Sequence, residues 1–227
     1  MQILIMNLQN KIIETIKTKE IQNVSSDIAD VFIDSVLEDG LLKEIPIIGS
    51  IVGLGKGIMC IQDRLFAKKL LVFLEQLKSI PENQRIKQIE KIENNKREKI
   101  KVGEKLLYLI QNCDDHLKSE IIGLLFAAYL SKEIDYEIFK RCSDCIIKAY
   151  IDLIYEIVES EYERLFLEES QDLINCGLFE MSPSIHITEN SPNEELGGKY
   201  SISGYDETGI STLGKTIRKI LKDKISN

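Results

Sequence analysis

Residues 65–77 read Leu-Phe-Ala-Lys-Lys-Leu-Leu-Val-Phe-Leu-Glu-Gln-Leu, and this stretch decides the fold class. Its apolar residues recur three or four positions apart, which places them on one face of a helix. The segment 79–81, Ser-Ile-Pro, ends the predicted helix, because proline disfavours helical backbone in the residue before it.

The same periodicity extends over most of the chain on either side of this helix. Apolar residues at helical spacing predict further helices within residues 3–39, 82–105, 106–110, 121–130 and 135–160. Asp114 and Asp115 precede one of them and can cap its first turn. No strand-like alternation occurs before residue 180, so the sequence predicts a mainly α fold in which residues 1–160 form a helical bundle.

The C-terminal part, residues 161–227, has a different pattern. Prolines and glycines cluster there, and two segments, 184–188 and 199–203, alternate like strands. A final helix is expected from Thr212. A helix, a two-stranded hairpin and a closing helix together predict a small winged-helix-like α+β module.

Charge and cysteine content narrow the function classes. The chain has 227 residues and a net charge of −8, and this acidity argues against broad nucleic-acid binding. Residues 41–110 carry 14 basic and 8 acidic side chains, whereas residues 111–180 carry 6 and 16, so the two blocks are expected to attract each other within the fold or between copies. The five cysteines are odd in number, and neither a signal peptide nor an apolar run of ~18 residues is present, which favours a cytoplasmic protein with reduced thiols.

A glycine ladder is the most unusual feature of the sequence. Gly49, Gly53 and Gly57 are spaced by four in the apolar segment 45–61, so on a helix they would line one face. Each glycine inside a helix costs ~1 kcal/mol, which a close helix–helix contact would offset. Lys56 lies within this segment and would have to reach a membrane surface or a wet pore if the segment entered a bilayer.

Two interpretations of this segment stay open. In one, the ladder is an oligomerisation or membrane contact, and Arg64, Lys68 and Lys69 meet anionic lipid headgroups or a partner. In the other, the segment is a buried helical hairpin or loop of a soluble bundle, and its glycines are tight packing points.

No catalytic, metal or cofactor motif emerges. Cys142 and Cys145 form a CxxC, but it lies within a predicted helix and has no second ligand pair, so we expect two packed core thiols. His116 has no partner at ligand spacing, His186 lies in a predicted strand, and the glycines near residue 55 lack the GK[ST] of a phosphate-binding loop. The sequence therefore predicts a protein that is not an enzyme and binds no cofactor.

The winged-helix-like module is expected to be a protein-contact or a structural element. Its recognition helix would span roughly residues 161–175, which hold five acidic residues and Arg164 as the one base. DNA phosphates would repel such a helix.

Three groups of residues resemble bacterial phage-defence proteins of the abortive infection alpha type. They are 45–49 leading into the helix at 68–74, 101–107 followed by the Asp114-Asp115 turn, and 177–179 with 212–215 at the C-terminal end. The resemblance covers about residues 36–222 and carries over no functional residue.

This resemblance implies a defence-associated, non-enzymatic effector or interaction protein. We expect it to act by self-association, by contact with another protein or with the inner membrane when activated. The alternative is a soluble regulator or adaptor whose C-terminal module binds a protein partner or DNA.

Overall fold

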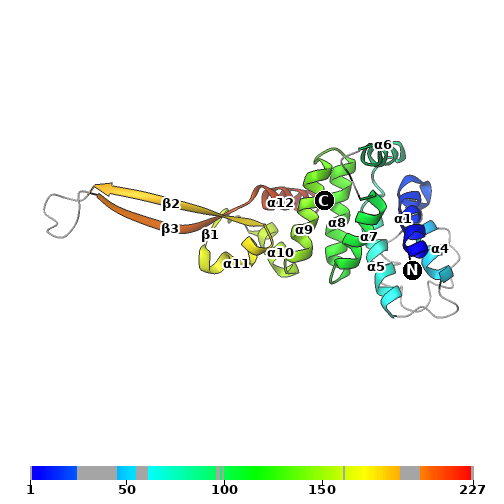
Figure 1. Cartoon of the computed structure of the whole chain (residues 1–227), viewed down its shortest axis with the longest axis horizontal. Helices are drawn as coiled ribbons and strands as arrows, with labels where there is room; N and C mark the ends of the chain where they lie inside the picture. Colours follow the sequence, from blue (N-terminus) through cyan, green and yellow to red (C-terminus); the bar gives the residue numbers. More distant parts are fainter. Residues whose placement is uncertain are drawn as a thin grey trace. The chain divides into compact units, whose positions relative to one another are not determined.

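The computed structural model describes residues 2–24, 45–54, 61–95, 98, 100–160, 162–189 and 200–225. Over this part of the chain the protein is mainly helical, with one small three-stranded antiparallel sheet, which confirms the predicted helical character (Figure 1). It divides into two compact units, Met1–Ile147 and Lys148–Asn227, whereas the sequence pattern placed a boundary after residue 160.

The first unit consists of helices. They are α1 (Gln2–Lys17), the short 3-10 helix η1 (Lys19–Asn23), α4 (Pro46–Leu54), α5 (Ile61–Glu75), α6 (Glu82–Glu93), α7 (Val102–Asn112), α8 (His116–Leu130) and α9 (Tyr136–Lys148). Residues 25–39 of the predicted helical segment 3–39 lie outside the described residues.

The core of the first unit forms where α5 packs along α8. Phe73, Phe126 and Phe139 are fully buried, and the ring of Phe126 lies 5.9 Å from that of Phe73 and 5.0 Å from that of Phe139. Such offset and tilted ring pairs stabilise a core beyond the apolar area they bury. The predicted cap is confirmed: the Asp115 carboxylate accepts a hydrogen bond from the Lys118 backbone N–H at 3.0 Å and begins α8.

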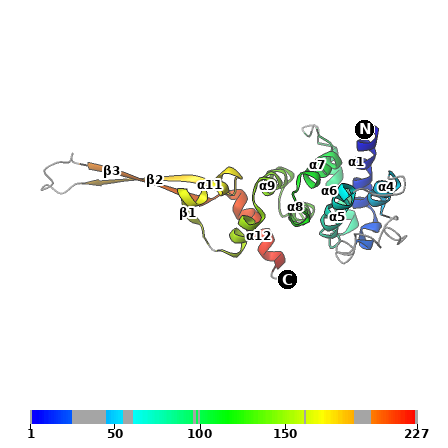
Figure 2. The same cartoon turned by 90° about the horizontal axis from the view of Figure 1, so that it is seen from below.

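Helix α1 packs against α4, α6 and α7. Its contact with α7 depends on Gly103, because a Cβ at that position would lie 2.3 Å from the backbone oxygen of Gln9. Figure 2 shows α1, α4, α5 and α7 gathered at the N-terminal end of this unit.

The second unit combines helices with the sheet. Its elements are α10 (Ile151–Glu159), β1 (Arg164–Phe166), α11 (Leu167–Asn175), β2 (Phe179–Glu189), β3 (Tyr200–Ile210) and α12 (Thr212–Ile225). The sheet order is β1-β3-β2, and β2 pairs with β3 over eleven residues from Phe179↔Ile210 to Glu189↔Tyr200.

Three predicted helices are wrong in part. The segment expected as a helix over 82–105 holds α6, which ends at Glu93, and the start of α7 at Val102. The helix expected over 135–160 is interrupted at Ala149 and Tyr150, where extended backbone at Tyr150 separates α9 from α10. The helix expected over 161–175 begins only at Leu167, because residues 164–166 pair with β3 as strand β1.

Candidate functional site

The glycine ladder lies partly on α4, a nine-residue helix that includes Gly49 and Gly53. Gly57 and Lys56 lie outside the described residues. At 1.5 Å per residue, α4 is about 13 Å long. Across the described helices, none combines the length and apolar character that a membrane span requires.

The apolar residues around Gly49 are buried. Ile45 precedes α4, and Ile47 and Ile48 lie on it; all three are fully buried, and α4 packs against α1. The Ile47 backbone N–H donates to Thr15 Oγ1 on α1 at 3.1 Å, which satisfies one of the free donors at the start of α4. The start of α4, up to Gly49, therefore belongs to the packing of the first unit.

The three basic residues predicted to meet lipid or a partner, Arg64, Lys68 and Lys69, lie on α5 and are half-buried. The Lys69 ammonium donates to the backbone carbonyl of Cys113, which ends α7. Lys69 therefore ties α5 to α7.

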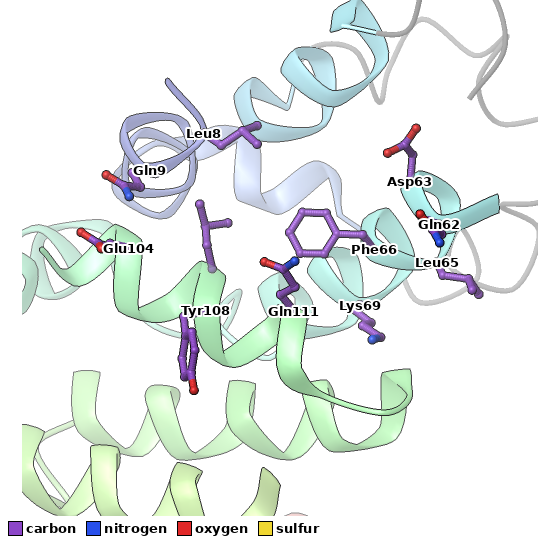
Figure 3. Close-up of a pocket in the computed structure, with 11 residues that line it drawn as sticks. Leu8, Gln9, Gln62, Asp63, Leu65, Phe66, Lys69, Glu104, Tyr108 and Gln111 are labelled. Atoms are coloured by element: carbon purple, nitrogen blue, oxygen red, sulfur yellow. The ribbon is translucent and has the colours of Figure 1, made fainter. Parts of the chain in front are cut away.

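An open groove of about 720 Å³ lies where α1, α5 and α7 meet (Figure 3). We call it the α5–α7 groove. Its lining consists of Leu8, Gln9, Gln62, Asp63, Leu65, Phe66, Lys69, Glu104, Leu107, Tyr108 and Gln111. The ring of Phe66 lies in the middle of this space, and Gln111 lies beside it.

Large apolar side chains remain exposed around the groove. Leu65 is 55% exposed, Tyr108 is 56% exposed, and Ile61, one turn before Leu65 on α5, is 75% exposed. The Lys105 ammonium lies 5.4 Å from the centre of the Tyr108 ring and forms an ion pair with Asp144 at 3.2 Å. This cation–π contact holds the Tyr108 ring against the surface of α7.

The polar side chains that line the groove are mainly amides and carboxylates. The lining contains three glutamine amides, two carboxylates and one ammonium, but no imidazole, thiol or aliphatic hydroxyl. Cys113 lies close to it in the fold, but burial raises the pKa of its thiol to about 12, so it remains protonated and unreactive at neutral pH.

Cys142 and Cys145 are both buried in the first unit as free thiols. Burial raises the pKa of Cys142 to about 12, the opposite of the shift that activates a nucleophilic or metal-binding thiol. Within the described ranges, no cluster of three or more His, Cys, Asp or Glu side chains could hold a metal ion. His116 begins α8 and is half-buried.

A second, basic hollow of about 580 Å³ lies between α6 and the end of α8. Lys87, Lys91 and Lys132 line it, together with Glu133 and Asp135. The two carboxylates offset most of the positive charge that an anionic cofactor would need.

The sequence pattern did not predict the groove, because it placed Leu65 and Phe66 on the apolar face of α5 together with the core residues. Phe66 is half-buried, and Leu65 is exposed. A signal was present: Leu65 shares a helical stripe with Lys68 and Lys69, three and four residues on, whereas the buried stripe runs through Leu70, Phe73 and Leu77.

No protein-family model, curated protein or solved structure matches this chain. Its function is therefore inferred from the geometry of its own surfaces.

Proposed function

We propose that this chain is a non-enzymatic interaction protein of a bacterial antiphage system of the abortive infection type, and that it binds a protein partner through the α5–α7 groove. The resemblance of residues 45–49, 101–107 and 212–215 to that family supports the pathway. The groove supports the mode of action.

The observation that carries the proposal is the exposure of Ile61, Leu65 and Tyr108 around a groove whose lining also includes Leu8, Phe66 and Leu107. Exposed apolar patches rimmed by polar groups mark binding surfaces, and tyrosine is enriched among the residues that dominate binding energy. A groove between helices accepts the apolar face of an amphipathic helix. Asp63 and Glu104 at its edge favour a partner helix with basic flanking residues.

The second unit is proposed to be winged-helix-like. The support is the β2–β3 hairpin that follows α11, together with the pairing of β1 with β3. The unit differs from a helix–turn–helix in one respect, because a single helix lies between β1 and β2 instead of two. Glu168, Glu169 and Asp172 are exposed on α11, which favours a protein surface as its contact over DNA.

The experiment that tests the proposal is phage challenge of bacteria that express the chain or its variants. Bacteria that express the chain should resist a subset of phages, and the Leu65→Glu and Tyr108→Ala variants should lose this resistance while their melting temperatures stay unchanged. Tyr150→Ala is the matched control, because Tyr150 is 68% exposed and does not line the groove. Full resistance from both groove variants would contradict the proposal.

A second candidate function is self-association or membrane contact through the glycine-rich segment when a trigger releases it. The exposed Ile61 follows this segment directly in the sequence, which favours an apolar surface there. A Gly53→Leu variant should then lose protection against phage and fail to float with vesicles of anionic lipid, although it stays folded. Equal flotation of the Gly53→Leu variant and the unaltered protein would dismiss this candidate.

A further inference from the structure

The hairpin of β2 and β3 extends well beyond the third strand of its sheet. Strand β1 pairs only with Glu207, Thr208 and Gly209, whereas the pairing of β2 with β3 continues to Glu189↔Tyr200. From Pro183↔Asp206 outward, the described sheet is a two-stranded ribbon that projects from the helices of the second unit (Figure 1). A two-stranded ribbon is marginally stable in water without further packing.

The outer edge of β2 carries backbone groups that can pair with another strand. The Ile210 N–H donates to the Glu163 carbonyl at 2.9 Å, on the β1 side of β3. Backbone groups alternate in direction along a strand, so the even residues of β3 are directed away from β2, and their opposite residues on β2 are directed to its free edge. Ile185 and Ile187, opposite Gly204 and Ile202, are therefore two such residues.

Pro183 is consistent with this assignment. It lies opposite Asp206, another even residue of β3, so its missing N–H falls on the free edge and costs no bond to β3. The register is continuous from Phe179 to Glu189, so the alternation holds along the whole ribbon.

The edge segment is nearly palindromic. Residues 184–188 read Ser-Ile-His-Ile-Thr, so the order of residue types is the same in both directions about His186. The segment carries no acidic or basic residue other than His186, although charges are the usual means by which edge strands avoid pairing. Ile187 is 67% exposed.

We propose that β2 pairs with β2 of a second copy of this chain, antiparallel and edge to edge, about a two-fold axis at His186. In this register Ile185 lies opposite Ile187 of the second copy, and Ile187 lies opposite Ile185 of the second copy. All four residues direct their N–H and C=O groups to the shared edge, so each pair exchanges two backbone hydrogen bonds. A two-fold contact requires such self-complementarity.

The pairing joins the two ribbons into a four-stranded sheet. Ile185, Ile187 and Ile202 occupy the same face of each ribbon, because alternate residues and directly paired residues share a face. The joined sheet would therefore carry isoleucines from both copies on the same face. A strand contact of this length is smaller than a standard interface of about 800 Å² per partner, so the dimer is weak and depends on protein concentration.

This self-association does not depend on the α5–α7 groove or its partner. Its test is sedimentation velocity of the full-length chain over a concentration series at neutral pH. Residue 186 meets itself at the axis, so His186→Lys and His186→Glu each place like charges opposite each other and should weaken dimerisation about fivefold. An equimolar mixture of the two variants should restore it, because opposite charges then meet.

The matched controls are Ser203→Lys and Ser203→Glu. Ser203 lies opposite His186 within the ribbon but on β3, away from the shared edge, so mixing these variants should change nothing. The cysteines of the described residues are buried, and Cys60, which lies outside them, is replaced by serine to prevent competing disulfides. In this Cys60→Ser background, a His186→Cys variant should also form an intermolecular disulfide under mild oxidation, whereas Ser203→Cys should not. A chain that stays monomeric at every concentration, or no rescue on mixing together with no His186→Cys cross-link, would overturn the proposal.

Discussion

At the scale of single residues, Arg85 holds together three segments of the first unit. It is 1% exposed, and its guanidinium donates to the carbonyls of Ile16 at 2.6 Å, Thr18 at 2.7 Å and Ile80. These carbonyls lie near the C-terminal end of α1 and in the turn after α5, where a positive charge is favourable. Burial lowers the pKa of Arg85, but guanidinium remains charged at neutral pH.

Replacing Arg85 with methionine should destabilise the protein strongly. The substitution keeps an apolar stem but leaves three buried carbonyls without their donor, at a cost of about 3 kcal/mol or more in the free energy of unfolding. Urea denaturation measures this cost. Arg141 is exposed, so Arg141→Met is the control and should change the free energy of unfolding by less than about 0.5 kcal/mol. Equal stability of both variants would show that the Arg85 contacts contribute little.

Gly214 is a second residue whose identity the packing requires. A Cβ there would lie 2.3 Å from the backbone oxygen of Leu178, so Gly214→Ala should lower the stability of the second unit by about 2 kcal/mol, although alanine favours helices. Gly209→Ala in the same unit is the control, because its Cβ would find its nearest neighbour at 3.7 Å. Thermal melts of the two variants should differ clearly. A Gly214→Ala protein as stable as the unaltered chain would contradict the close contact.

The raised pKa values of the buried thiols give a prediction about their rate of chemical labelling. With a pKa of about 12, the thiols of Cys113 and Cys142 are thiolate in about one molecule in ten thousand at pH 8, so a thiol reagent should label them only slowly in the folded protein. Labelling in a Cys60→Ser background should become fast once urea unfolds the chain. Rapid labelling of either thiol without urea would contradict its burial.

Local residue signals in the sequence predicted local structure well. The Asp115 cap and the start of α12 at Thr212 were predicted, because capping and turn chemistry depend on neighbouring residues. The burial of Arg85 was not predicted, because two of its three carbonyl partners lie 69 and 67 residues away and a carbonyl leaves no mark in a sequence.

At the scale of elements, α8 is the central helix of the first unit. Eleven of its fifteen residues are buried, including Lys118, whose ammonium donates to Asp114 at 2.5 Å and to the Ile147 carbonyl at 3.3 Å. Helical periodicity found this helix, but it failed where tertiary contacts decide. Strand β1 forms because β3 offers it an edge, and Leu65 is exposed because no described helix covers that stripe of α5.

Removing the cap of α8 tests the role of this helix. Asp115→Ala should lower the free energy of unfolding by about 1 kcal/mol, because the Lys118 N–H loses its acceptor. Asp115→Ser should retain most of the stability, since serine also caps. Chemical denaturation compares the two, and identical values would mean that the cap is dispensable.

At the scale of the whole molecule, the chain divides into two compact units. In the second unit, the buried apolar residues include Ile154, Leu173, Leu178, Phe179 and Ile217. The ion pairs between the basic block 41–110 and the acidic block 111–180 do not all follow the net charges of the blocks. Lys105 pairs with Asp144 in the expected sense, but Lys140 pairs with Glu98 in the opposite one.

A fragment of residues 148–227 should therefore fold alone. An 80-residue unit of this kind is expected to be only moderately stable, with a free energy of unfolding of about 3–5 kcal/mol. Circular dichroism should show helix and strand together, and urea should unfold the fragment in one cooperative step. A featureless spectrum would mean that the second unit depends on the first.

The uninterrupted register of β2 and β3 also restricts how this protein can change in evolution. Adding one residue to each strand near Asp206 and Pro183 would keep every pair but turn the isoleucine-bearing face to the opposite side. Adding one residue to a single strand would create a bulge. Descendants that keep the isoleucines on the same side should therefore lengthen or shorten each strand by two residues at a time. The number of residues in the ribbon would then change in steps of four.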